Sequence, residues 1–294
     1  MHKSGFVNII GNPNVGKSTL MNALVGEKLS IITSKAQTTR HRILGIVNGD
    51  DFQIVFSDTP GILKPCYKLQ ESMMNFVRGA LSDADVLLYV TDTVEREDER
   101  AAEIIDRIRQ SGVPTLVVVN KIDLTTQEAL EALVEKWRAT LPDAEIIPIS
   151  AREGFNIAGL FDRILALLPE GEPFYPKDTL TDKTLRFFAS EIIREKILRN
   201  YDKEIPYSCE IEIEEYREEP GIDRISAVIY VARNSQKGIL IGHKGEKLKK
   251  VGRQAREELE EFLRKKVFLQ LFVKVSEDWR NDQRQLRRFG YDPQ

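Results

Sequence analysis

The first residues that could do chemistry lie near the start of the chain, in a glycine-rich run that fits the pattern GxxxxGK[ST]. An apolar run at 6–10 precedes it and predicts a buried strand, and residues 19–25 predict a helix that begins directly after it. Glycines let a backbone turn its N–H groups toward phosphate oxygens, while a lysine reaches the β- and γ-phosphates and a hydroxyl serves Mg²⁺. The sequence therefore predicts a nucleoside triphosphate site. Its residues are Gly11, Asn12, Pro13, Asn14, Val15, Gly16, Lys17, Ser18 and Thr19.

Two further loops, each following an apolar strand-like run, indicate which base is bound. Guanine presents N1–H and an exocyclic amine, two donors that the Asp123 carboxylate can accept together, whereas adenine has no such pair. Asn120 can bond guanine N7 and the neighbouring loop, the stem of Lys121 can cover the ring, and the Ala151 amide can donate to guanine O6. The loops consist of Asn120, Lys121, Ile122 and Asp123, and of Ser150, Ala151 and Arg152.

A third loop predicts the metal and γ-phosphate contacts. The run Asp58, Thr59, Pro60 and Gly61 ends a strand-like segment, so that Asp58 is suited to support a metal ion and Gly61 lets a backbone N–H approach the γ-phosphate. One threonine of the segment 35–41 is expected to complete the Mg²⁺ shell and sense the γ-phosphate. Thr38 is the first choice and Thr39 stays open. The predicted metal-associated residues are Ser18, Thr38, Thr39 and Asp58.

Strand-like and helix-like segments alternate from residue 6 to about residue 168, which predicts a three-layer α/β domain with ligand loops at the carboxyl ends of its strands. A hairpin signal at 48–51 predicts that the second and third strands are antiparallel, and helical patterns between the others predict parallel pairing. The expected strands are 6–10, 43–47, 52–57, 86–90, 115–119 and 145–149.

Three prolines within 169–176 break this periodicity and predict a linker. The predicted organisation is a nucleotide-binding domain at 1–170, a linker at 171–180 and a second, smaller α+β domain at 181–294. The elements expected in the second domain are a helix at 184–200, strands at 207–214 and 225–233, helices at 238–251 and 252–265, and a strand at 267–275.

The second domain contains a loop and a charge pattern suited to nucleic acid. A GXXG loop can clamp single-stranded RNA with its bare backbone against a basic helix, as in a KH domain. Residues 237–256 hold seven Lys or Arg and one Glu, so lysines there can approach phosphates while apolar side chains contact bases. The expected RNA-binding residues are Ile239, Ile241, Gly242, His243, Lys244, Gly245, Lys247 and Lys250.

Composition sets the broad class. The 294 residues are long enough for two domains, 41% are hydrophobic and 30% are charged, and no apolar run approaches the length needed to cross a bilayer. Residues 1–180 hold 19 Lys or Arg against 25 Asp or Glu, and residues 181–294 hold 24 against 21. Cys66 and Cys209 offer no disulfide framework or metal spacing, which predicts a reducing cytoplasm.

In this order, the motifs resemble those of the translation-factor-related GTPases, and within them the Era family, over essentially the whole chain. The motifs are GNPNVGKS, KAQTTRHR, DTPG, NKID and SAR, followed by the GXXG loop. The resemblance implies a P-loop GTPase domain and a KH domain, GTP and GDP as ligands, and Mg²⁺ as cofactor. It also implies binding to the 3′ end of 16S rRNA during small-subunit assembly, no DNA partner, and a cytoplasmic protein with peripheral contact at the inner face of the cell membrane.

Ile62 departs from the Ras-like pattern, which places a water-orienting glutamine at this point. Isoleucine cannot form a hydrogen bond through its side chain, so we expect slow hydrolysis with the water positioned in another way. Some relatives with the same Pro-Asn pair use bound K⁺, and Asn14 is the matching position here. The resemblance therefore implies Lys17, Thr38, Gly61 and Asn14 as catalytic residues, with Ile62 among the nucleotide contacts.

Two other functions remain open at this point. One is a GTPase that mainly modifies RNA, although the sequence shows no second catalytic cluster or cofactor motif. The other is an RNA-binding module fused to an inactive nucleotide domain, against which Lys17, Ser18, Asp58 and Asp123 all argue.

Overall fold

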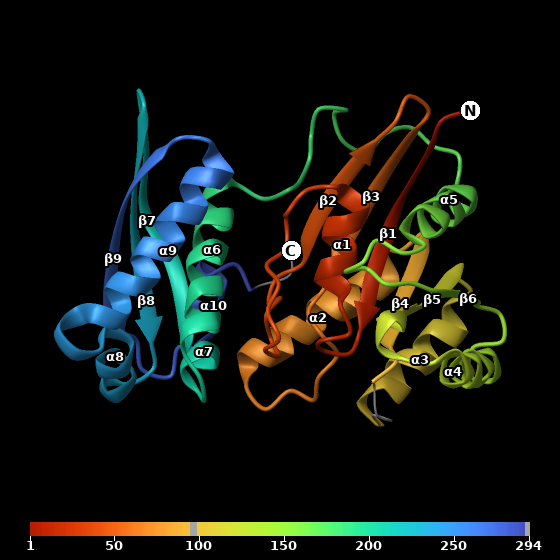
Figure 1. The fold of residues 1–294 in the computed structure, drawn as a ribbon, viewed down its shortest axis with the longest axis horizontal. Coiled ribbons are helices and arrows are strands. Elements are labelled where there is room, and N and C mark those ends of the chain that lie inside the picture. The colour runs from red at the N-terminus through yellow and green to blue at the C-terminus, as the bar shows by residue number, and fades with distance from the viewer. Residues whose placement is uncertain (95–98, 292–294) are drawn as a thin grey trace. The chain divides into compact units, whose positions relative to one another are not determined.

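The structure is a computed structural model that describes residues 1–94 and 99–291. Contacts divide the chain into two compact units, residues 1–66 with 70–182 and residues 67–69 with 183–294. Each unit has its own sheet (Figure 1). None of the described helices combines the length and apolar character that spanning a bilayer requires.

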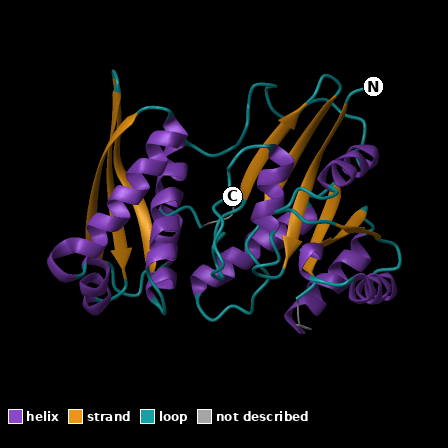
Figure 2. Cartoon of the chain, in the orientation of Figure 1, coloured by secondary structure: helices purple, strands orange, loops and turns teal. Residues whose placement is uncertain are grey.

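The first unit alternates strands and helices (Figure 2). Its strands are β1 (Lys3–Gly11), β2 (Ile43–Asn48), β3 (Phe52–Asp58), β4 (Val86–Asp92), β5 (Thr115–Asn120) and β6 (Glu145–Pro148). Its helices are α1 (Lys17–Val25), α2 (Lys68–Ser82), α3 (Glu99–Ser111), α4 (Gln127–Thr140) and α5 (Ile157–Leu167), with a 3-10 turn at Ile122–Leu124.

The six strands form one sheet in the order β2-β3-β1-β4-β5-β6. Strand β2 pairs with β3 in the antiparallel sense, as the hairpin signal predicts, and every other pair is parallel. Parallel strands have their carboxyl ends at one edge, so the loops that follow β1, β3, β5 and β6 gather there. The predicted α/β fold is confirmed.

The sheet is buried on both faces, which explains the nearly continuous apolar runs of its central strands. Side chains of Ile10, Tyr89 and Val117 pack in a core cluster with residues of α2, α3 and α4. On the other face, Phe161 of α5 lies with its ring centroid 5.9 Å from that of Phe52. Two helical layers thus fix the sheet and the loops at its carboxyl edge.

The predicted linker, residues 171–180, is held by the first unit. Gln53 is fully buried in β3, and its side chain bonds the backbone of this segment. Its Oε1 accepts from the amides of Phe174 and Tyr175 at 2.7 and 2.9 Å, and its Nε2 donates to the Tyr175 carbonyl and to Asn48 Oδ1, both at 2.8 Å. Three prolines break the sequence pattern and therefore indicate a linker. The side-chain amide of Gln53, which fixes this linker, lies far away in the sequence, so the local pattern does not reveal the contact.

The end of this segment runs along the edge strand β2. The Ile46 amide donates to the Leu180 carbonyl at 2.8 Å, and Thr181 Oγ1 donates to the Leu44 carbonyl at 2.6 Å. The Leu44 amide donates to Asp182 Oδ1 at 3.0 Å. These bonds satisfy backbone groups that an edge strand would otherwise leave open, and the first unit therefore extends to Asp182.

The second unit packs helices against a three-stranded sheet. The sheet order is β7-β8-β9, with β7 and β8 antiparallel and β8 and β9 parallel. The strands are β7 (Cys209–Glu219), β8 (Ile222–Val231) and β9 (Lys266–Val275). The helices are α6 (Leu185–Asn200), α7 (Ile205–Ser208), α8 (Asn234–Ile241), α9 (Glu246–Leu263) and α10 (Gln283–Arg288), with a 3-10 turn at His243–Gly245.

One helix boundary predicted for this unit is wrong. The sequence predicts a helix boundary at 251/252, whereas α9 runs without a break through that point and the boundary lies at 242–245. Val251, Ala255 and Leu259 recur every four residues and are buried, so they form one continuous apolar face. The remaining elements follow the expected order, but the short helices α7 and α10 were not predicted, and α7 includes the first two residues of the strand expected at 207–214.

Candidate nucleotide site and nucleic-acid interface

The glycine-rich run forms a tight turn between β1 and α1. Asn14 and Gly16 have φ of 66° and 97°, and α1 begins at Lys17. Lys17 is buried, and its Nζ donates to the carbonyls of Gly11 and Asn12 at 3.0 and 2.8 Å. The ammonium group therefore lies over the loop, at the amino end of a helix where a phosphate is favoured.

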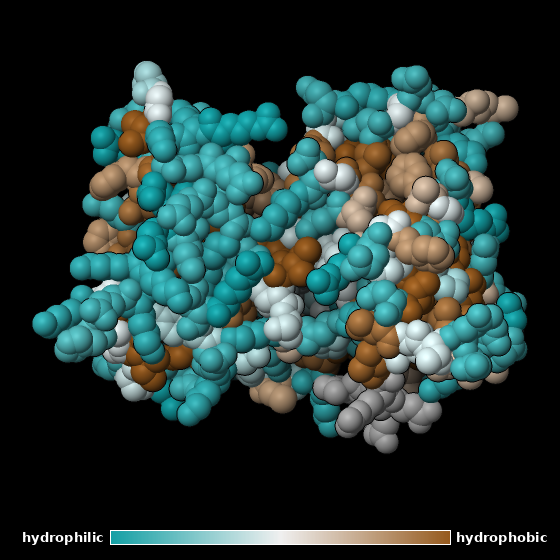
Figure 3. Space-filling view, in the orientation of Figure 1, coloured by the Kyte–Doolittle hydropathy of each residue, from teal (hydrophilic) through white to brown (hydrophobic). Residues whose placement is uncertain are grey.

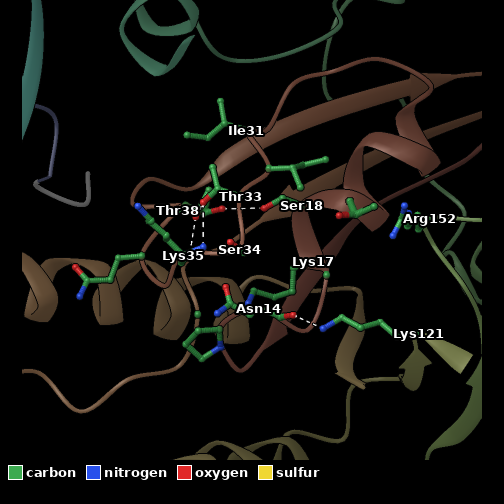
Figure 4. Close-up of a pocket in the computed structure, with 17 residues that line it drawn as sticks. Asn14, Lys17, Ser18, Ile31, Thr33, Ser34, Lys35, Thr38, Lys121 and Arg152 are labelled. Carbon is green, nitrogen blue, oxygen red and sulfur yellow. Dashed lines mark hydrogen bonds between the residues drawn. The ribbon is translucent and has the colours of Figure 1, made fainter. Parts of the chain in front are cut away.

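A pocket of about 450 Å³ lies beside this loop. Figure 4 shows that side chains of the loop lie on one side of it and those of residues 31–38 on another, with Lys121 and Arg152 at a third. The predicted residues that line it are Pro13, Asn14, Gly16, Lys17, Ser18, Thr19, Thr38, Thr39, Gly61, Lys121 and Arg152. The predicted residues outside the lining are Gly11, Asn12, Val15, Asp58, Thr59, Pro60, Ile62, Asn120, Asp123, Ser150 and Ala151.

Most of one wall of the pocket was not predicted from the sequence. Its residues are Ile31, Ile32, Thr33, Ser34, Lys35 and Gln37, all from the segment between α1 and β2. Lys35 and Gln37 lie within the segment 35–41 that the sequence already indicated. The signal for the other four is that the whole stretch from residue 26 to 42 has no helical or strand period, so the loop is longer than its KAQTTRHR core.

Three oxygen-bearing side chains meet where α1 begins and β3 ends. Ser18 Oγ donates to Asp58 Oδ2 at 2.7 Å, and Thr39 Oγ1 donates to the same oxygen at 3.3 Å. Ser18 Oγ and Thr39 Oγ1 are 2.8 Å apart. We call Ser18, Thr39 and Asp58 the hydroxyl–carboxylate cluster.

This cluster fits Mg²⁺, which prefers hard oxygen ligands. Asp58 is fully buried, and its Oδ1 has no hydrogen-bond partner among the described residues. Burial raises the pKa of the Asp58 carboxyl, and the hydrogen bond from Ser18 and the charge of Lys17 lower it in part. An orphaned carboxylate oxygen beside two hydroxyls is an arrangement that a divalent cation would stabilise.

The structure brings Thr39, and not Thr38, into this cluster, and so favours the threonine that the sequence ranked second. Thr38 Oγ1 donates to the Lys35 carbonyl at 2.6 Å and lies 2.6 Å from Thr33 Oγ1. Thr38 therefore supports its own loop at the wall of the pocket, whereas Thr39 is buried against Asp58.

Gly61 and Ile62 follow Asp58 in the chain and have different structural roles. A Cβ atom at Gly61 would lie 2.8 Å from the Pro13 Cα atom, so only glycine allows this close approach of the two loops. The Ile62 side chain is buried in the core with Ile10 and Val77, and its amide donates to the Gly11 carbonyl at 3.1 Å. Ile62 was expected among the nucleotide contacts, but its side chain lies in the core.

The base loops are joined to one another and to the glycine-rich loop. Asn120 Nδ2 donates to the Val15 carbonyl at 2.9 Å, and Asn120 Oδ1 accepts from the Ala151 amide at 2.9 Å. The Ala151 amide, which was expected to face guanine O6, thus bonds Asn120 in this structure. Ser150 Oγ donates to Asp123 Oδ1 at 2.6 Å, which orients the carboxylate expected to read guanine.

Lys121 connects the base loop to the phosphate loop. Its Nζ donates to the Asn14 carbonyl at 2.6 Å (Figure 4). The same Nζ forms an ion pair with Asp92, a mostly buried carboxylate at the end of β4. Lys121 therefore ties the base loop to the glycine-rich loop and to the end of β4.

In the second unit, the GXXG loop is a turn between α8 and α9. Gly242 and Gly245 have φ of 71° and 80°, a region that glycine enters without strain. The side chains of His243 and Lys244 between them are exposed. The turn therefore presents bare backbone and a basic side chain to the surroundings.

The helices beside this turn present the other predicted RNA contacts. Lys247 and Lys250 are exposed on α9, whose visible surface is hydrophilic in Figure 3. Ile239 is 44% exposed at the end of α8, and Ile241 is partly buried. An exposed isoleucine among lysines is the combination expected where bases and phosphates are contacted together.

Family models match both units. Residues 6–121 match the family described as 50S ribosome-binding GTPase, and residues 204–280 match the KH domain. GTPase Era of Syntrophus aciditrophicus is 46% identical over 294 residues, which covers 99% of this chain and 96% of that protein. GTPase Era of Alkaliphilus metalliredigens is 45% identical over 293 residues and is covered to 99%, as is this chain.

Two solved structures are similar over the whole length. One is Era in complex with MgGDPNP and nucleotides 1506–1542 of 16S ribosomal RNA, at 42% identity, a TM-score of 0.95 and full coverage of both chains. The other is a point variant of Aquifex aeolicus Era bound to GDP and AlF4⁻, at 43% identity and a TM-score of 0.95, covering 99% of this chain and 100% of that one.

The contrast between the two threonines gives a matched pair of variants, since each change to alanine removes one hydroxyl and one methyl group. We expect Thr39→Ala to weaken Mg²⁺-dependent binding of a GTP analogue by about tenfold, because the cluster loses one oxygen. Thr38→Ala should have a clearly smaller effect. Titration of a fluorescent GTP analogue with Mg²⁺ and with EDTA measures this, and a larger loss in Thr38→Ala would contradict the assignment.

Proposed function

The chain belongs to the Era family and is a GTPase, and from that premise we propose that its nucleotide state controls binding of its KH domain to RNA. The observation that carries the proposal is that one chain combines the hydroxyl–carboxylate cluster beside a phosphate loop with a GXXG turn flanked by exposed lysines. The first arrangement can sense a γ-phosphate and the second can hold a single strand.

In the proposed site, different side chains contact the base, the phosphates and the metal ion. Asp123 reads the guanine edge, and Lys17 and the amides of the loop bind the phosphates. Ser18 and Thr39 would hold Mg²⁺, with Asp58 supporting it, and the ion would neutralise charge between the β- and γ-phosphates. These assignments agree with the oxygen-rich environment of the cluster and the close fit at Gly61.

Hydrolysis in this site is proposed to be slow. The side chain at the position of a water-orienting glutamine is Ile62, which is buried in the core and cannot contact water. Lys17 and the Gly61 amide remain to stabilise charge on the transferred phosphoryl group. A slow reaction suits a switch that must hold one state long enough to bind RNA.

We propose the 3′ end of 16S rRNA as the RNA, and assembly of the small ribosomal subunit as the process. The support is the full-length similarity to Era in complex with nucleotides 1506–1542 of that RNA. Bases would contact Ile239 and Ile241, while Lys244, Lys247 and Lys250 approach phosphates. The family that matches residues 6–121 is described as 50S ribosome-binding. Those residues contain nucleotide loops and no part of the KH domain, so that description does not identify the RNA that the KH domain binds.

The same proposal places the protein in the cytoplasm, where ribosomal subunits assemble. Peripheral contact with the inner face of the cell membrane stays a prediction from the resemblance alone.

Asn14 leads to a test of monovalent-cation dependence. We propose that Asn14, which lines the pocket, helps to hold K⁺ near the phosphates, where it supplies positive charge in the transition state. GTP hydrolysis should be about tenfold faster in KCl than in NaCl of equal ionic strength, and Asn14→Ala should remove most of this difference. Equal rates in both salts would contradict the proposal.

A single lysine tests the RNA site. We expect Lys244→Ala to weaken binding of RNA with the sequence of nucleotides 1506–1542 by about tenfold at 0.1 M salt, through the loss of one charge-assisted phosphate contact. The slope of log affinity against log salt concentration should fall by about 0.7. Fluorescence anisotropy measures both quantities.

Lys136→Ala, which removes an exposed lysine from α4 of the first unit, is the matched control. It should leave affinity and salt slope unchanged. Equal losses in the two variants would show that binding follows total charge and would contradict a site at the GXXG turn.

A further inference from the structure

Tyr201, which no motif singles out, lies behind the GXXG turn. It follows α6 directly, is 4% exposed, and belongs to the core cluster that also contains Leu240 of α8 and Val251 of α9. A tyrosine in an apolar core needs a partner for its hydroxyl, and the partner shows what the residue holds in place.

The hydroxyl is bonded to the helix that leads into the turn. Tyr201 Oη donates to the Leu240 carbonyl at 2.5 Å, two residues before Gly242. The carbonyls of a helix's last turn have no partner within the helix, so a side chain that takes this role fixes where the helix ends. Burial, with a smaller contribution from Cys209, raises the pKa of Tyr201 to about 12, so the hydroxyl keeps its proton and remains a donor.

The ring of Tyr201 contacts the helix that leaves the turn. The Lys247 Nζ lies 5.8 Å from the ring centroid, in a cation–π arrangement. The stem of the same lysine covers Gly242, since a Cβ atom there would lie 2.8 Å from Lys247 Cγ. One buried side chain thus contacts the chain on both sides of the GXXG turn.

We propose that Tyr201 is a positioning residue for RNA binding, which sets the backbone of Gly242–Gly245 and the place of the Lys247 ammonium group. This inference rests on the proposed function for its RNA consequence, but the geometry that it assigns exists without RNA. A clamp made of bare backbone binds well only when its conformation is fixed beforehand, because otherwise binding must order it.

Amide hydrogen exchange of the RNA-free, full-length protein tests the positioning directly. Tyr201→Phe removes the hydroxyl and keeps the ring, so the amides of residues 242–245 should exchange about fivefold faster, as expected for the loss of one hydrogen bond. Tyr216→Phe is the matched control, because it removes the bond from Tyr216 Oη to Asp223 Oδ2 at 3.0 Å within the β7–β8 hairpin. Equal exchange at residues 242–245 in both variants would overturn the inference.

The RNA consequence is read from a double-mutant cycle of Tyr201→Leu and Lys247→Ala, with RNA of nucleotides 1506–1542 as the probe. If the ring places the ammonium group, the double variant should lose clearly less affinity than the product of the two single losses. Independent losses would contradict the role of the ring. If the wild-type protein does not bind this RNA, the proposed function fails, and the exchange measurement still decides the positioning of the turn.

Discussion

The nucleotide site depends on one buried carboxylate. Asp58 Oδ2 accepts hydrogen bonds from Ser18 and Thr39, and these three residues come from α1, from the end of β3 and from the loop between α1 and β2. A buried charge of this kind is stable only when its partners are in place, so it ties three separate segments to one point. Because burial works against the ionised form, the site also favours whatever brings positive charge to it.

Strand β2, which follows the cluster in the chain, holds the segment that leads to the second unit. That strand begins four residues after Thr39, and its Leu44 and Ile46 hold the segment that ends at Asp182, where the first unit gives way to the second. Gln53 holds the earlier part of the same segment from within β3. The chain that leads to the KH domain is therefore bound to the strand that follows the loop of Thr39. In the second unit, Tyr201 likewise joins separate segments, since it connects the end of α6 to both sides of the GXXG turn.

The sequence predicts those parts of the structure correctly in which a local pattern of residues is compatible with only one conformation. The glycine-rich loop, the hairpin at 48–51 and the parallel strands follow from local patterns, and the structure has them all. The choice between Thr38 and Thr39 could not be made, because neighbouring residues of an irregular loop point in directions that only its backbone decides. The boundary between α8 and α9 lies at the glycines of the GXXG turn and not at 251/252, because the apolar face of α9 continues from Val251 through Ala255 to Leu259. The contacts of Gln53 and Tyr201 join residues far apart in sequence, and no spacing rule reveals them.

The central claim is that the nucleotide in the first unit determines the affinity of the second for RNA. It is tested most directly by measuring the affinity of the full-length protein for RNA of nucleotides 1506–1542 with a non-hydrolysable GTP analogue, with GDP and without nucleotide, at one salt concentration. Linkage requires that any such control appears as a difference between these affinities. The account predicts tighter binding with the GTP analogue than with GDP, by about fivefold or more. Three equal affinities would contradict it.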